Sequence, residues 1–187
     1  TERLHKWLGI PPSEQPPNFY QLLGLEKFEV DVGVISDAAE RQIEHVRAYG
    51  KGESANDARE VLNELERAKR CLLNSDQKLA YDKTLGGADA NRAIPNYLSV
   101  EFDPFYQWLG IPTTHQPPTH YRLIGIYPGE TDAEVIQAAT DRQMSHIRRK
   151  AISQRGELSE RILTELATAC VCLLDPRKRA AYDHDLQ

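Results

Sequence analysis

The sequence predicts an all-α protein made of two tandem four-helix units, each with an N-terminal Trp/Pro-rich arm and a central antiparallel helix pair. Two observations support this fold class. First, most of the sequence consists of two similar segments whose matching residues are a constant number of positions apart. Within each copy, apolar residues recur at the three- and four-residue intervals of amphipathic helices.

An internal duplication spans most of the chain. The Trp-Leu-Gly-Ile-Pro segment at 7–11 returns at 108–112, and the closing Ala-Tyr-Asp at 80–82 returns at 181–183. Both pairs are 101 positions apart, since 108 − 7 equals 181 − 80. Solenoid repeats are roughly 20–50 residues long, so the duplicated unit is a domain. We therefore expect a first domain over 1–86, a Gly-rich linker over 87–101, and a second domain over 102–187.

The arm and a short helix open each copy. The arms around Trp7 and Trp108 contain several prolines, so we expect extended segments whose tryptophans are anchored in the core. A short helical turn is expected over 20–23, ended by Gly24.

A long helix is expected next, from about residue 31 to 47. In the second copy, Thr131 and Glu134 predict a capping box at its start, because each side chain can satisfy a free backbone N–H of the first turn. A polar loop is expected over 50–54.

The second long helix and a short final helix complete the copy. An apolar stripe predicts the second long helix over about 58–74. Asp175 followed by Pro176 predicts the start of the last helix, which includes the Tyr-Asp pairs at 81–82 and 182–183. We expect these pairs to close the last helix onto the bundle; the alternative is an acid and a phenol in a site.

Composition disfavours several functional classes. The net charge is −5 with acidic and basic residues interspersed, so no nucleic-acid partner is expected. No stretch reaches the roughly 18 apolar residues of a membrane span, and no basic-then-apolar leader is visible, so we expect a cytoplasmic protein. Three cysteines (Cys71, Cys170 and Cys172) fit structural thiols in a reducing compartment. The first residue, Thr1, suggests a fragment or a processed form.

The closing Leu-Leu-Asp-Pro-Arg-Lys-Arg-Ala-Ala-Tyr-Asp of 173–183 and the opening Tyr-x-Leu-Leu-Gly of 20–24 resemble a DnaJ-type J-domain. The resemblance covers 18–85 and 119–186 and implies four helices with an antiparallel central pair. It also implies a His-Pro-Asp tripeptide after the second helix, with which J-domains stimulate a DnaK-type chaperone. The matching positions hold Arg-Ala-Tyr at 47–49 and Arg-Arg-Lys at 148–150. Co-chaperone activity therefore does not carry over, whereas the fold and a binding surface do.

These observations predict a non-enzymatic protein-protein interaction or scaffold module built from two degenerate J-like domains. The repeated Trp-Leu-Gly-Ile-Pro segment also resembles modules inside larger bacterial proteins, which implies a longer protein or assembly. No catalytic residue, cofactor or metal site is expected, and the partner is another protein of unknown identity. The alternative is a divergent co-chaperone that binds a DnaK-type chaperone. The candidate partner-binding residues are His45, Arg47, Tyr49, His146, Arg148, Arg149 and Lys150.

A polar network is a further hypothesis. Gln42 and Gln143 interrupt the apolar stripe of the first long helix, and His45 and His146 follow one turn later. Buried polar groups need partners. We therefore expect them to connect the two long helices through Glu64 and Glu165, with Arg41 and Arg142 as further members.

Overall fold

The computed structural model describes residues 2–49, 54–87, 102–151 and 156–186 of the chain. Helices α1–α10 account for most of these residues, and no strand occurs among them. The prediction of an all-α protein is confirmed.

The chain divides into two compact units. Unit 1 combines Thr1–Pro16 with Ile111–Gln187, and unit 2 is Pro17–Gly110. This division differs from the expected domains over 1–86 and 102–187, because each arm packs with the helices of the other copy. Of the expected linker over 87–101, only Gly87 lies within the described residues.

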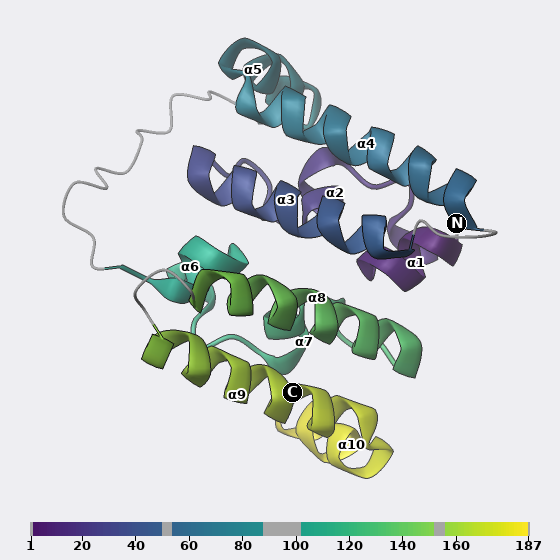
Figure 1. Ribbon diagram of the computed structural model, residues 1–187, viewed down its shortest axis with the longest axis vertical. Coiled ribbons are helices and arrows are strands. Elements are labelled where there is room, and N and C mark those ends of the chain that lie inside the picture. The colour runs from purple at the N-terminus through teal and green to yellow at the C-terminus, as the bar shows by residue number, and fades with distance from the viewer. Residues whose placement is uncertain (1, 50–53, 88–101, 152–155, 187) are drawn as a thin grey trace. The chain divides into compact units, whose positions relative to one another are not determined.

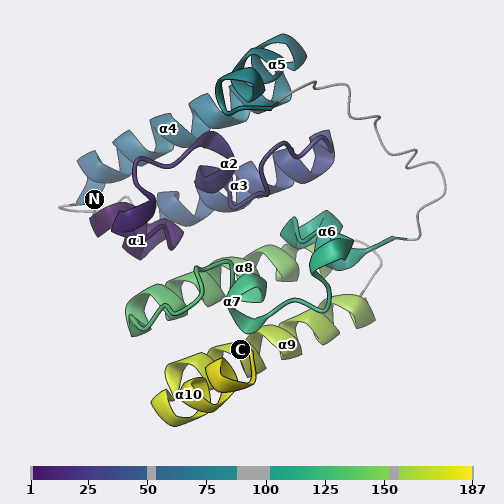
Figure 2. The same cartoon turned by 180° about the vertical axis from the view of Figure 1, so that it is seen from behind.

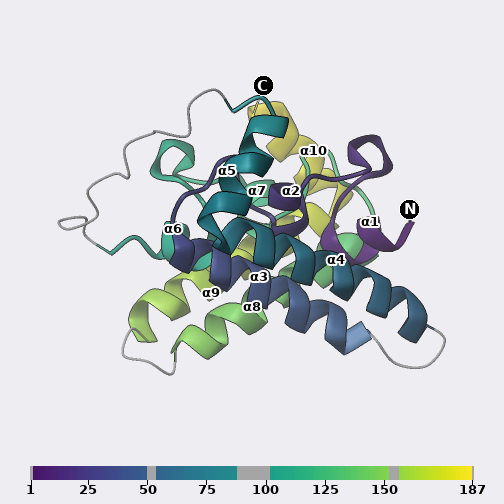
Figure 3. The ribbon, with the colours of Figure 1, turned by 90° about the horizontal axis from the view of Figure 1, so that it is seen from above.

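The two long helices of unit 2 run antiparallel and side by side (Figures 1 and 3). The short helix α2 contacts both, α5 packs on α4, and α6 packs on α3. The apolar face of α3 is buried, as the helical spacing predicts. The helices of this unit are α2 (Phe19–Leu23), α3 (Val32–Tyr49), α4 (Ala55–Leu73), α5 (Ser75–Thr84) and α6 (Pro104–Leu109).

Unit 1 repeats this arrangement with an arm from the beginning of the chain. Helices α8 and α9 form its antiparallel pair, and α7 lies against both (Figure 2). Helix α10 packs on α9, and α1 packs on α8. The bounds are α1 (Glu2–Leu8), α7 (His120–Ile124), α8 (Ala133–Ala151), α9 (Gly156–Leu174) and α10 (Pro176–Asp185).

The arms begin as helices, so the expectation of wholly extended arms is wrong. Helices α1 and α6 end just before Gly9 and Gly110, whose φ angles are +72° and +71°. The prolines of the Trp-Leu-Gly-Ile-Pro and Gln-Pro-Pro segments follow these glycines and lie outside α1 and α6. Trp108 is buried, as expected, whereas Trp7 is only partly buried.

The helix starts were predicted with mixed success. Asp175 caps α10 by accepting the backbone N–H groups of Arg177 and Lys178, as expected. The capping box at Thr131 is wrong. The Asp132 side chain accepts the N–H of Glu134 instead, at 2.8 Å.

The Tyr-Asp pairs close the last helix onto the short helix of the same copy. In unit 2, the Tyr20 hydroxyl donates to Asp82 at 2.5 Å, and the Phe19 N–H donates to the Tyr81 hydroxyl at 2.8 Å. In unit 1, the Tyr121 hydroxyl donates to Asp183 at 2.8 Å. The expected structural role of these pairs is confirmed.

Candidate functional site

Each unit contains a site that holds a helical arm, here called the arm-binding site. In unit 2 the arm is 102–110, and the site is formed by Leu25, Glu29, Val34 and Arg41. The Arg41 guanidinium donates to the main-chain carbonyl of Trp108 at 2.7 Å. The hydroxyl of Tyr106 donates to Glu29 at 2.9 Å.

The arm-binding site of unit 1 uses the equivalent positions. The arm is 2–10, and the site is formed by Ile126, Glu130, Glu134 and Arg142. Arg142 donates to the carbonyl of Trp7 at 2.9 Å and to that of Gly125 at 3.2 Å. The same arginine position therefore captures the same tryptophan carbonyl in both units.

A buried cation suits this position because a helix leaves its last carbonyls without partners and carries partial negative charge there. Arg41 is only 3% exposed. Burial lowers the pKa of Arg41 to about 10, although the nearby Asp37 carboxylate opposes this shift. The guanidinium is therefore still protonated at neutral pH and donates charge-assisted hydrogen bonds to the end of the arm helix.

Glycine is required where each arm helix ends. The left-handed backbone of Gly9 and Gly110 is strained for other residues. A Cβ on Gly110 would lie 2.9 Å from Leu25 Cδ2, and one on Gly9 would lie 3.1 Å from Ile126 Cγ2. The Trp-Leu-Gly-Ile-Pro motif thus combines a carbonyl for the arginine, apolar contacts and a close backbone approach.

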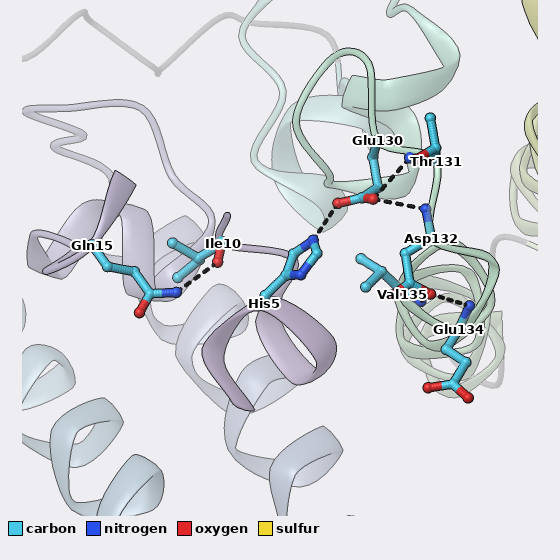
Figure 4. A network of polar contacts seen from close by, with 8 residues as sticks. All are labelled: His5, Ile10, Gln15, Glu130, Thr131, Asp132, Glu134 and Val135. Carbon is cyan, nitrogen blue, oxygen red and sulfur yellow. Dashed lines mark hydrogen bonds and ion pairs between the residues drawn. The ribbon is translucent and has the colours of Figure 1, made fainter. Parts of the chain in front are cut away.

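A polar contact joins the arm of unit 1 to its site (Figure 4). The ring of His5 contacts the Glu130 carboxylate at 2.5 Å. The same carboxylate accepts the N–H groups of Thr131 and Asp132, both at 2.8 Å. Burial disfavours the charged carboxylate, but these contacts outweigh it and hold the pKa of Glu130 below its usual range.

The expected Gln/His/Glu network between the long helices is not formed by these residues. Gln42 and Gln143 instead donate to the carbonyls of Leu23 and Ile124, at the ends of α2 and α7. Glu64 is exposed. The glutamines therefore fix the short helix of each unit, whereas the neighbouring arginines fix the arm.

The predicted partner-binding residues lie at the ends of α3 and α8, within the last helical turns and not in a loop. Arg47 and Tyr49 are exposed, with His45 half-buried and its ring 5.0 Å from that of Tyr49. In the second copy, Arg148 and Arg149 are exposed and Lys150 is half-buried.

His146 is not on the surface, where a partner-binding residue would have to lie. Its side chain is buried, only 3% exposed, so it does not contribute to the surface at the end of α8. The rest of the expected loop at 50–53 lies outside the described residues.

A shallow groove between α9 and α10 was missed by sequence reasoning. It is lined by Leu174, Pro176 and Val171, and Val171 is 57% exposed. The only signal for it is an apolar residue on the polar side of the α9 stripe.

No protein-family model, curated protein or solved structure matches this chain. In the described ranges, no group of three or more His, Cys, Asp or Glu side chains is placed to hold a metal ion. Within the same ranges, no helix is both long enough and apolar enough to cross a membrane.

Proposed function

We propose that the chain is a non-enzymatic protein-interaction or scaffold module, formed by two degenerate J-like domains within a larger protein or assembly. The observation that carries this proposal is the set of basic and aromatic side chains exposed at the end of α3, with a basic counterpart at the end of α8. Arg47 has a side chain 64% exposed, and Tyr49 is 39% exposed. Exposed arginine and tyrosine are the residue types that interfaces favour.

The charge of these helix ends indicates an acidic segment of a partner protein. Arg47 approaches one carboxylate, Glu66, at 3.9 Å, and this exposed pair is weak. Arg148, Arg149 and Lys150 add three more basic residues at the equivalent end. Basic residues at each of these helix ends accelerate association with an acidic partner and make binding sensitive to salt.

The positions also coincide with the surface that J-domains use for their chaperone, although the tripeptide is absent. A partner other than a DnaK-type chaperone therefore fits these residues better. The module proposal and the co-chaperone alternative differ in one measurable property, which is stimulation of ATP hydrolysis.

The test is photo-crosslinking from the full chain with a benzophenone amino acid in place of Tyr49, in lysate of the source cells. Each captured protein is then purified and titrated against three chains: the wild type, R47E/R148E, and the control R67E/R70E. The control reverses two exposed charges on α4 and has the same net charge as the test variant. We expect R47E/R148E to weaken binding at least tenfold and R67E/R70E to leave it within twofold.

Equal binding of all three chains would refute the proposed surface. If the captured protein is a DnaK-type chaperone whose ATP hydrolysis rises with the wild type and not with R47E/R148E, the co-chaperone alternative is correct. We expect no stimulation.

A further inference from the structure

Unit 1 is assembled from two pieces of chain that are distant in the sequence. The arm is within Thr1–Pro16 and its binding site is within Ile111–Gln187, with the whole of unit 2 between them. Helix α1 is therefore held on α8 by noncovalent contacts alone. An association of this kind can also form between two chains, as it does in domain swapping.

The contacts that hold the arm are those of a docked ligand. The end of α1 is recognised through its Trp7 carbonyl by Arg142, and Gly9 lies against Ile126. Two side chains of the arm contact carboxylates of the site, since the His5 ring lies 2.5 Å from Glu130 and the Lys6 ammonium lies 3.2 Å from Glu134. The arm also carries an internal contact, because Gln15 donates to the Ile10 carbonyl at 3.0 Å.

We propose that the arm-binding site of unit 1 is a docking site for the arm of a second copy of this chain, and that copies associate by exchanging residues 2–16. This site differs from the helix ends of the proposed function, and the two proposals stand independently. A chain that fills its own site excludes the incoming arm, because a tethered segment competes at an effective concentration of about millimolar. Exchange therefore becomes prominent in crowded assemblies or where the chain's own arm is displaced.

One charge difference between the two sequence copies favours one pairing of arm and site, and as an exposed ion pair it adds only a small part of the binding energy. The position equivalent to Lys6 is Gln107, and the position equivalent to Glu134 is Gly33, each 101 residues away. The arm of 2–10 therefore matches the acidic site of unit 1, whereas the arm of 102–110 matches unit 2 through Tyr106 and Glu29. The preferred occupant in an exchanged dimer is the first arm of the other chain.

Complementation between two full-length variants tests the proposal. Gly9→Val disables the arm, since a β-branched residue at φ +72° is strained and its Cβ would lie 3.1 Å from Ile126. Arg142→Met disables the site by removing both carbonyl contacts and keeps a long unbranched side chain at this position. In a mixture, the intact arm of the R142M chain meets the vacant site of the G9V chain.

At about 50 micromolar, each variant alone should be monomeric. An equimolar mixture of the two should form a heterodimer, measured by light scattering after size-exclusion chromatography. A mixture of G9V with G9V/R142M is the matched control and stays monomeric, because neither chain has an intact first arm. A monomeric G9V plus R142M mixture, with both variants folded by circular dichroism, would overturn the proposal.

A peptide experiment keeps the proposal testable if a variant does not fold. A fluorescent peptide of residues 2–16 is titrated against the wild-type chain, next to the same peptide carrying Gly9→Val. We expect saturable binding of the wild-type peptide, at least tenfold tighter than that of the Gly9→Val peptide, and competition by unlabelled wild-type peptide. Equal binding of both peptides, or none at millimolar peptide, refutes a docking site for this arm.

Discussion

Removing the hydroxyl of Tyr20 is expected to destabilise unit 2 more than the equivalent change at Tyr121 destabilises unit 1. Tyr20 is fully buried and donates at 2.5 Å to Asp82, whose side chain is 5% exposed. Losing a hydrogen bond to a buried charged group costs about 1.5–3 kcal/mol, and Tyr20→Phe should fall in this range. Asp183 is only half-buried, and water can replace the Tyr121 hydroxyl there. Tyr121→Phe should therefore cost about 1 kcal/mol.

Each unit contains one tryptophan, which allows its unfolding to be followed separately. Trp7 belongs to unit 1 and Trp108 to unit 2, and the chain has 2 tryptophans in all. Urea unfolding is measured by fluorescence in a Trp7→Phe background for unit 2 and in a Trp108→Phe background for unit 1. A cost for Tyr20→Phe no larger than that for Tyr121→Phe would refute the reasoning. It would mean that Lys78, 2.6 Å from Asp82, satisfies the carboxylate alone.

The pH dependence gives an independent check on the same hydroxyl. Burial, followed by the hydrogen bond to Asp82, raises the pKa of Tyr20 above its usual value of about 10. The stability that comes from the neutral hydroxyl is therefore complete below about pH 10 and is lost as the pH rises through the folded-state value. Unit 2 should weaken in this alkaline range, and Tyr20→Phe should make the decline shallower.

Two further predictions concern unit 1 and use the Trp7 signal. Gly125→Ala should destabilise unit 1 by about 2–3 kcal/mol and Gly129→Ala by about 1 kcal/mol. Both glycines have positive φ angles, but only a Cβ on Gly125 would lie close to another atom, Gln143 Nε2 at 2.7 Å. Equal costs in urea unfolding would contradict this contact. Glu130 has a lowered pKa, so its contribution is present above the unfolded value of about 4.3 and is lost as the pH falls through the folded value. Acid unfolding of Glu130→Gln should therefore depend less on pH below about 4.3, and an unchanged profile would show that this carboxylate is not stabilised in the folded state.

The helices follow from short-range physical rules, which is why the sequence predicts most of them. The apolar stripe of α4 and the Asp175 cap of α10 are local signals, and both elements form where expected. The start of α8 was misplaced because the carboxylates of Glu130 and Asp132, next to Thr131, take the free N–H groups. Residue type alone does not decide among neighbouring acceptors.

The candidate sites were harder to predict from the sequence, because their positions depend on which side of each helix is covered by another segment. Arg47 and Tyr49 were predicted to face a partner, and they are exposed. His146 has the same spacing from its neighbours as His45 but is buried, 3% exposed. The sequence predicts Arg41 in a network between the long helices, whereas its partner is the arm carbonyl of Trp108, 67 residues away. Periodicity identifies a face but not the segment that covers it.

In the folded chain, the arm of each sequence repeat packs with the helices of the other repeat, and the residues common to both repeats do not explain this pairing. Arginine, tryptophan and glycine, which hold the arm, are present in both copies at the same spacing, so either arm would satisfy either site by these residues alone. Only positions that differ between the copies, such as Lys6 and Glu134, favour one pairing, and that exposed ion pair contributes little energy by itself. Each arm-binding site therefore recognises an arm mainly through residues that both sequence copies share. A chain with this property keeps its own arms at low concentration and exchanges them when a neighbour competes, so the same duplicated motif serves both internal folding and association between copies.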